Sequence, residues 1–382
     1  MTKPIVLWTN IPSFHLIGPF QKLAETRETI CVCRQATSSH RSDMWKAPDF
    51  GKLQVVYLKD KEHPNRFVQE FLAQYKGAAH FMSGFGTQPG TETFWKLAPR
   101  FRIKPIALAE RPNPQRNPVK ALLRDAYYAA RIRAISKWLG AVLCMGSLSV
   151  DAYRRYGIPK RKLLPYMYTS ALPFPELPEK VEIGAPLRFV YVGRDDPWIK
   201  GLDLLAEALK GLTPEQLTFD FIGPNPDSWL AKFAEENGLS GVIRVLGKLP
   251  NDQIAPKLAN EYDVLALVGR YDGWGMTVSE ALFSGLGVLA SDACGSQDVA
   301  RASGAGKVLP KGSVDAIRSA IRELVDNPSQ VLEWKNRARA YRDALRAERL
   351  APYLEEVVEY AERGCSGEKP NPYWLEGSDV SR

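Results

Sequence analysis

The sequence lacks a long apolar run: no stretch of about 18 or more consecutive apolar residues occurs in its 382 residues. Its start, MTKPIVLWTNIPSF, also lacks the apolar core and small-residue cleavage site of a secretory signal. We therefore expect no membrane-spanning helix and a cytoplasmic location.

Residues that bind metals are scarce. There are four histidines and five cysteines, and the cysteines show no metal-site spacing. We expect buried or inert thiols, with Cys31 and Cys33 of CVC on two faces of a strand. No metal and no cofactor is expected.

A dinucleotide fingerprint is also missing. No GxGxxG follows the first apolar run, and the spacing of Gly84, Gly86 and Gly90 does not supply one. This absence excludes a Rossmann dehydrogenase.

What is present is the composition of a folded protein, with 45% hydrophobic and 25% charged residues. A chain of this length is too long for a single core and suits two domains. The charge is uneven. Residues 1–180 hold 28 Lys and Arg against 13 Asp and Glu, a net of +15, which leaves −7 of the total of +8 for the rest. The basic half indicates an anionic partner or, alternatively, a solvated basic face.

Short apolar runs alternate with helical stretches through both halves. In the first half PIVLW, TICVC, LQVVYL, AAHFM and PIALA have strand character, and the series restarts with LRFVYVG after the proline-rich SALPFPELPEK. Alternation of this kind predicts parallel sheets covered by helices, hence an α/β chain of two doubly wound, Rossmann-like domains. The expected limits are residues 1–170 and 184–342, then a terminal helix at 343–363 that crosses back to the N-terminal domain, and a tail at 364–382.

The first candidate segment, YVGRDDPWIKG, lies between a predicted strand and a predicted helix. Ligands of open α/β sheets bind at the carboxyl ends of strands. Gly193 permits a tight turn, and Arg194 with Lys200 places two cations on one short loop, which suits a diphosphate. The alternative is an ordinary solvated loop.

The second segment, DGWGMTVSEA, runs from a predicted strand into a helix. Free N–H groups at a helix start attract anions. Glu280 and Asp272 can accept hydrogen bonds from ribose and sugar hydroxyls. The competing interpretation is that Thr277 to Glu280 form a capping box, in which both side chains only satisfy backbone donors.

Together the two segments resemble the retaining glycosyltransferases of family 4, which carry a Gly-Arg followed by Lys-Gly and later an acid, seven residues and a glutamate. This chain has GR-x5-KG at 193–201 and seven residues between Asp272 and Glu280. The resemblance covers residues 185–300 well. The family usually has glutamate where this chain has Asp272, which is one methylene shorter.

The resemblance implies a GT-B fold, with two Rossmann-like domains facing a central cleft. It implies that Arg194 and Lys200 neutralise the leaving diphosphate and that Glu280 holds the nucleotide ribose. Asp272 would grip the sugar. The implied donor-binding backbone comprises Gly193, Gly273, Gly275, Met276, Thr277 and Val278.

The N-terminal half of that family binds the acceptor, but here the first loop, TNIPSFHLIGPF, has one glycine instead of a glycine-rich run. Candidates for contact with acceptor or donor are His15, His80 and Glu110. For each, a purely structural or surface role is the alternative.

Residues 116–143 interleave cations with aromatic and apolar side chains at helical spacing. The pattern suits peripheral contact with an anionic membrane, at the inner face of the cytoplasmic membrane. The alternative is a core helix with charges facing water.

We therefore expect a retaining hexosyltransferase that moves a sugar from a UDP- or GDP-sugar to a saccharide acceptor of lipid-linked, lipopolysaccharide or O-antigen type. A GT-B nucleotide-sugar epimerase is one alternative. The other is a non-catalytic anion- or nucleic-acid-binding protein, although no nucleic-acid motif is present and no such partner is expected.

Overall fold

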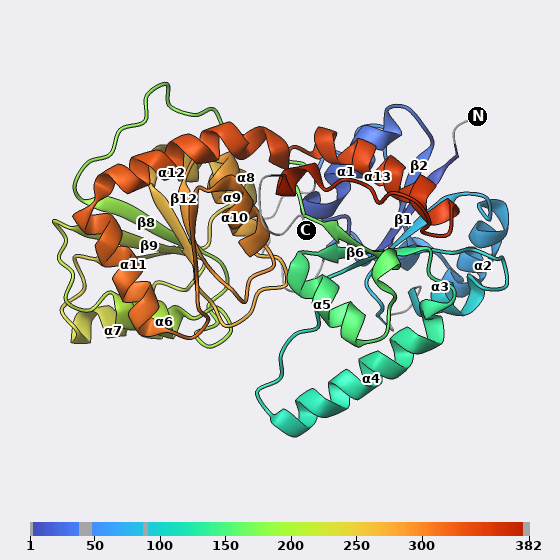
Figure 1. Cartoon of the computed structure of the whole chain (residues 1–382), viewed down its shortest axis with the longest axis horizontal. Helices are drawn as coiled ribbons and strands as arrows, with labels where there is room; N and C mark the ends of the chain where they lie inside the picture. Colours follow the sequence, from blue (N-terminus) through green and yellow to red (C-terminus); the bar gives the residue numbers. More distant parts are fainter. Residues whose placement is uncertain (1–2, 38–47, 87–90, 377–382) are drawn as a thin grey trace. The chain divides into compact units, whose positions relative to one another are not determined.

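A computed structural model describes residues 3–37, 48–86 and 91–376, and these form two compact α/β units (Figure 1). The first unit runs to Leu172 and includes Arg346–Pro372. The second begins at Pro173, runs to Leu345 and includes the described residues 373–376. The predicted α/β class and two-domain architecture are confirmed.

Among the described residues of the first unit, seven strands form one parallel sheet in the order β3-β2-β1-β4-β5-β6-β7. In register, Val6 of the central strand lies between Ile30 and His80. Helices cover both faces, so the central strands are buried and mostly apolar. The strands are β1 (Ile5–Thr9), β2 (Thr29–Cys33), β3 (Gln54–Tyr57), β4 (Ala79–Ser83), β5 (Ile106–Ala109), β6 (Ala141–Met145) and β7 (Leu163–Tyr166).

The helices of the first unit include one from the end of the chain. They are α1 (Phe14–Ala24), α2 (Pro64–Gln74), α3 (Thr91–Leu97), α4 (Pro118–Ser136), α5 (Ser147–Arg155) and α13 (Ala347–Glu362). The terminal helix α13 packs on α1 (Figure 1). Gly18 permits this approach, because a Cβ there would lie 2.8 Å from the Cβ of Ala347. Of the predicted tail at 364–382, residues 377–382 lie outside the described residues.

The second unit repeats the plan, with six strands among its described residues in the order β10-β9-β8-β11-β12-β13. Its strands are β8 (Leu187–Val192), β9 (Leu217–Ile222), β10 (Ile243–Gly247), β11 (Val264–Leu267), β12 (Gly287–Ser291) and β13 (Gly306–Leu309). Its helices are α6 (Leu202–Ala208), α7 (Trp229–Glu236), α8 (Asn251–Glu261), α9 (Met276–Phe283), α10 (Gln297–Ser303), α11 (Val314–Asp326) and α12 (Pro328–Tyr341). Strands β8 and β11 are neighbours, so the segments that follow them leave the same edge of the sheet.

Two sequence expectations need correction. The helical pattern assigned to 116–143 is too long: α4 ends at Ser136, and Ala141–Met145 is the buried strand β6. Cys31 and Cys33 do not lie on two faces, since their Sγ atoms are 3.3 Å apart. Side chains two residues apart in a strand share a face.

Candidate functional site

The loop after β8 turns against the loop after β9. A Cβ on Gly193 would lie 2.4 Å from the Tyr191 hydroxyl, and one on Gly223, at φ +117°, would lie 1.9 Å from the Gly193 carbonyl oxygen. The Tyr191 hydroxyl donates to the Arg194 carbonyl at 2.9 Å. These contacts hold the backbone on both sides of Arg194, whose side chain is exposed to solvent. Tyr191 and Gly223 were not among the predicted site residues. The sequence signal for them is a glycine directly after a strand, in YVG at 191–193 and FIG at 221–223.

Lys200, at the end of this loop, lies beside the loop after β11. Its Nζ donates to a carboxylate oxygen of Asp272, and fewer than one-fifth of either side chain is exposed. Gly201 caps α6 at φ +68°, with its Cβ position 3.0 Å from the Cα of Gly269. The fold thus brings together a cation and a carboxylate that are 72 residues apart.

Helix α9 begins after Gly275, which is the N-cap residue at φ +86° and supplies no side-chain cap. Met276, Thr277 and Val278 are therefore the first helical residues, and Val278 N–H donates to the Gly275 carbonyl at 3.0 Å. The capping-box interpretation is wrong, because Thr277 lies inside the helix and not at its cap. Val278 N–H is therefore already engaged, whereas Met276 and Thr277 come before the first i→i−4 bond of the helix. Their N–H groups and the helix dipole make this end suitable for an anion.

A second segment supports the loop before α9. Asp272 N–H donates to the Ala293 carbonyl at 3.1 Å, and Ser296 N–H donates to the Trp274 carbonyl at 2.7 Å. Gly295 lies so close that a Cβ there would be 2.3 Å from the Gly273 carbonyl oxygen. Asp272, Gly273 and Trp274 are therefore held in place by backbone contacts, and the Ser296 hydroxyl donates to the Gly275 carbonyl at 3.1 Å.

Glu280 lies just over one turn inside α9 and is partly buried. Burial raises the pKa of its carboxyl to about 7. Within the described parts of the chain, no hydrogen-bond donor or cation pairs with this carboxylate. A half-buried acceptor without a protein partner can accept hydrogen bonds from ligand hydroxyls.

These groups surround the carboxyl edge of β8 and β11, where open α/β sheets bind ligands. One wall carries Arg194 and Lys200, and the other carries the start of α9 with Asp272 and Glu280. Burial first, then the Asp272 carboxylate, raises the pKa of Tyr191, while Arg194 lowers it. Charges on both loops therefore act on the same side chain. This arrangement of two cations, a helix start and two carboxylates can hold an anion.

His80 is a structural residue. It lies in β4 with 2% of its surface exposed. Trp8 Nε1 donates to its Nδ1 at 3.1 Å, and its Nε2 lies 2.9 Å from the Tyr75 carbonyl oxygen. Burial lowers its pKa to about 4. Protein groups occupy both ring nitrogens, so His80 is not available to contact acceptor or donor. It has the structural role that the sequence left open as the alternative.

Glu110 and His15 follow the carboxyl ends of strands in the first sheet. Glu110 comes directly after β5 and is exposed, and its carbonyl accepts from Tyr153 Oη at 2.6 Å. Burial and then the charge of Glu110 raise the pKa of Tyr168. His15 is in the first turn of α1, packed on Phe14 with 4.1 Å between ring centroids. Tyr168, which was not among the predicted site residues, therefore lies within electrostatic range of Glu110 at this edge.

Helix α4 exposes an apolar stripe. Val119, Leu122, Leu123 and Tyr127 have 64%, 71%, 65% and 52% of their surface exposed, and Ile132 is the buried residue of the helix. The interpretation of a core helix is therefore wrong for its first half. Two of the expected membrane cations are already engaged: Arg124 pairs with Asp125, and Arg131 donates to the Phe85 and Gly86 carbonyls.

None of the helices in the described part of the chain is long and apolar enough to cross a bilayer. Residues 174–341 match the family model described as "Glycosyl transferases group 1". No curated protein matches the chain.

Solved structures of similar fold cover almost the whole chain. The Anabaena protein Alr3699/HepE, in complex with UDP, is 13% identical with a TM-score of 0.69, covering 94% of this chain and 100% of its own. WaaG, a glycosyltransferase involved in lipopolysaccharide biosynthesis, is 15% identical with a TM-score of 0.61, covering 94% and 99%. The lipopolysaccharide outer core galactosyltransferase WaaB is 14% identical with a TM-score of 0.62, covering 92% and 99%. The chain therefore has the GT-B fold of these glycosyltransferases, and its residues 174–341 are similar to the group 1 glycosyl transferase family.

Proposed function

We propose that this protein is a retaining hexosyltransferase that moves a sugar from a nucleoside-diphosphate sugar to a saccharide acceptor. The observation that carries the proposal is the convergence of Arg194, Lys200, Asp272 and the start of α9 at one sheet edge. The Anabaena relative in complex with UDP-glucose supports a UDP-sugar as the first donor to test.

In this proposal the donor diphosphate binds between the two cations and the start of α9. Negative charge grows on the departing diphosphate as the glycosidic bond breaks, and preorganised positive groups stabilise it. A diphosphate carries more charge than one carboxylate, so it draws Lys200 away from Asp272. Asp272 is then available to a sugar hydroxyl, while Glu280 accepts from the ribose.

For retention, the resemblance to family 4 implies that the acceptor hydroxyl arrives on the side of the leaving group and that a donor phosphate oxygen accepts its proton. No side-chain nucleophile is then required. Arg194 and Lys200 provide the positive charge that a metal provides elsewhere, so we propose a reaction that needs no metal and no cofactor. Glu110 and His15 remain the acceptor-side candidates.

The acceptor we propose is lipid-linked or of lipopolysaccharide type, and the enzyme works at the inner face of the cytoplasmic membrane. The exposed stripe of α4 supports this. Apolar side chains at positions 119, 122, 123 and 127 share one helix face, with the exposed Lys120 beside them. Such a face lies in the interfacial region of a bilayer with its cations near anionic head groups.

The test is release of nucleoside diphosphate from UDP-, GDP- and ADP-sugars, with and without envelope glycolipids. We expect acceptor-dependent release that drops at least about 100-fold in Arg194→Ala and in Glu280→Ala, the usual cost of one transition-state contact. Lys232→Ala, which removes an exposed cation of the same unit, should keep full activity. The anomeric configuration of the product, read by NMR, tests retention.

Two results would contradict the proposal. Donor turnover without any acceptor would identify an epimerase. Tight binding of nucleic acid, with no consumption of donor and a steep salt dependence, would indicate a binding protein that uses its basic half.

A further inference from the structure

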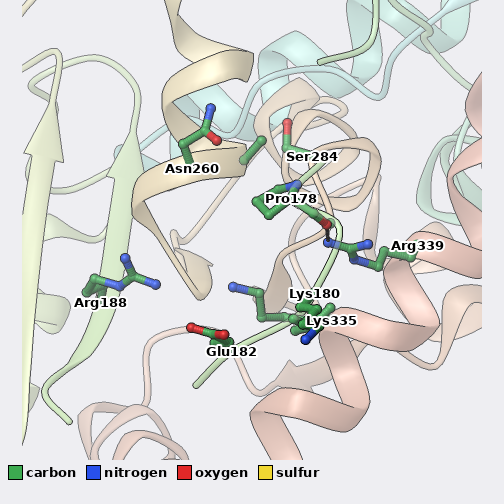
Figure 2. Close-up of a pocket in the computed structure, with 11 residues that line it drawn as sticks. Pro178, Lys180, Glu182, Arg188, Asn260, Ser284, Lys335 and Arg339 are labelled. Carbon is green, nitrogen blue, oxygen red and sulfur yellow. Dashed lines mark hydrogen bonds between the residues drawn. The ribbon is translucent and has the colours of Figure 1, made fainter. Parts of the chain in front are cut away.

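A polar pocket of about 360 Å³ lies in the second unit, at the opposite edge of the sheet from the donor site (Figure 2). Its walls are the segment 178–182, the start of β8, the ends of α8 and α9, and one face of α12. Four cations line it: Lys180, Arg188, Lys335 and Arg339. Figure 2 shows Arg188 and Arg339 on opposite sides, with Lys335, Lys180 and Glu182 between them.

A buried carboxylate positions two of these cations. Asp263 has no exposed surface, and its Oδ1 accepts from Arg188 Nη2 at 3.0 Å and from Lys335 Nζ at 2.9 Å. Its Oδ2 accepts from the Arg188 backbone N–H and from Arg188 Nε, at 3.0 and 3.2 Å. Arg188 Nη1 is left without an acceptor among the described residues, and Lys335 Nζ, which also donates to the Tyr262 carbonyl at 3.2 Å, keeps a third N–H.

The other two cations have no carboxylate partner in the described part of the chain. Arg339 donates to the Pro178 carbonyl through Nη2, and Lys180 is exposed at the pocket rim. Glu182 is the one carboxylate that lines the pocket. Counting it with Asp263, four positive charges meet two negative charges, which leaves +2.

A phosphate monoester carries a charge of about −1.5 to −2 at pH 7 and has three acceptor oxygens. That charge matches the excess in the pocket, and Arg188 presents donors in a geometry that its pair with Asp263 holds fixed. The carboxyl end of α9 at Ser284 opposes an anion with a partial negative charge. The net side-chain charge of +2 in the pocket outweighs this partial negative charge. The cavity volume leaves room for more than the phosphate group.

We propose that this pocket binds a small phosphate monoester of about the size of a hexose phosphate, separately from the donor. The same elements reach both sites within this unit: β8 runs from Arg188 to the loop of Arg194, and α9 runs from Met276 to the pocket at Ser284. The inference does not depend on the proposed transfer reaction, because it concerns only the charges at this edge of the sheet.

The test is calorimetric titration of the full chain with glucose 6-phosphate and with inorganic phosphate. Lys180→Glu should weaken binding roughly three- to fivefold or more, the size of an exposed charge contact, and Glu182→Gln should tighten it. Lys232→Glu makes the same charge change at an exposed position outside the pocket and should leave binding unchanged. Arg194→Ala, at the donor site, should also leave it unchanged.

Opposite shifts from Lys180→Glu and Glu182→Gln would support the pocket, since a role confined to folding does not produce them. Three results would overturn it: no binding of either probe, equal weakening by Lys180→Glu and Lys232→Glu, or weakening only by Arg194→Ala. Melting temperatures without phosphate verify that each variant is folded.

Discussion

Lys200 Nζ donates to the carboxylate of Asp272, which joins the GR-x5-KG loop to the segment that leads into α9. Both residues were predicted for the donor site from separate motifs. The ion pair shows that the two motifs meet in one place. In the proposed reaction, the donor diphosphate competes with Asp272 for Lys200.

Replacing Asp272 by asparagine should therefore lower kcat/KM for the donor. Asparagine has the shape of aspartate but lacks the charged oxygen that is proposed to accept from a sugar hydroxyl. A hydrogen bond to a charged group contributes about 1.5–3 kcal/mol. That corresponds to roughly a 10- to 100-fold loss. Asp227→Asn, on an exposed loop of the same unit, is the control and should be as active as the wild type. Full activity in Asp272→Asn would remove this residue from the site.

The ionised Glu280 carboxylate should lower the free energy of unfolding while it strengthens donor binding. Its carboxyl has a pKa of about 7 in the fold, raised by burial from an ordinary value of 4.5. An acid whose folded pKa is higher than its unfolded pKa binds its proton more tightly in the native state, so the stability it contributes is lost as pH rises from 4.5 through 7. Glu280→Gln should thus be more stable than the wild type at pH 8, by on the order of 2 kcal/mol in urea unfolding.

The same variant should bind donor more weakly, with a flatter pH dependence. Wild-type affinity should rise with pH through about 7, as the ionised carboxylate becomes the ribose acceptor. Parallel pH profiles for the wild type and Glu280→Gln would contradict this assignment.

Gly275→Ala should destabilise the second unit. Its φ is +86°, and a Cβ would lie 2.4 Å from Cys294 Sγ and 2.7 Å from Leu267 Cδ2. Strain and overpacking together should cost about 3 kcal/mol or more. Gly238→Ala is a matched control at φ +66°, with nothing within 4 Å of the new Cβ. It should cost about 1–2 kcal/mol. Equal urea midpoints for Gly275→Ala and Gly238→Ala would show that contact of the new Cβ with Cys294 and Leu267 does not destabilise the fold.

A chelator should leave turnover unchanged, because in the proposed reaction Arg194 and Lys200 supply the positive charge for the leaving diphosphate. Lys200→Ala should lower kcat about 100-fold, the scale of one lost electrostatic contact in a transition state. Measurement of kcat with EDTA, and after addition of Mg²⁺ or Mn²⁺, checks both statements. If EDTA abolished activity and added metal restored it, the two cations alone would not be sufficient to stabilise the leaving diphosphate.

Membrane contact through α4 should depend on its apolar stripe. The double variant Leu122→Ser, Leu123→Ser should sediment with phosphatidylglycerol vesicles at least tenfold less than the wild type. The two leucines are exposed in the protein, and their transfer from water into the bilayer contributes several kcal/mol. Leu246→Ser with Leu332→Ser changes two exposed leucines of the other unit and should have no effect. Equal sedimentation of both double variants would exclude α4 as the contact.

By itself the sequence determined the alternation of strands and helices, the two-unit α/β plan and the two motifs assigned to a donor site, although it missed β6 within the stretch predicted as helical. These depend on local patterns: apolar runs, a proline-rich break and residues at fixed spacing. It did not determine side-chain environment. The sequence pattern of His80 does not distinguish a ligand from a core residue, and only packing against Trp8 and Tyr75 does so.

The tertiary structure alone decided what depends on distant residues. It placed Lys200 against Asp272, buried Glu280 enough to raise its pKa, and left the first half of α4 uncovered. It also gathered Lys180, Arg188, Lys335 and Arg339 around one pocket, although they span 160 residues of sequence. Burial and electrostatic interaction act between neighbours in space, and a linear pattern does not contain those neighbours.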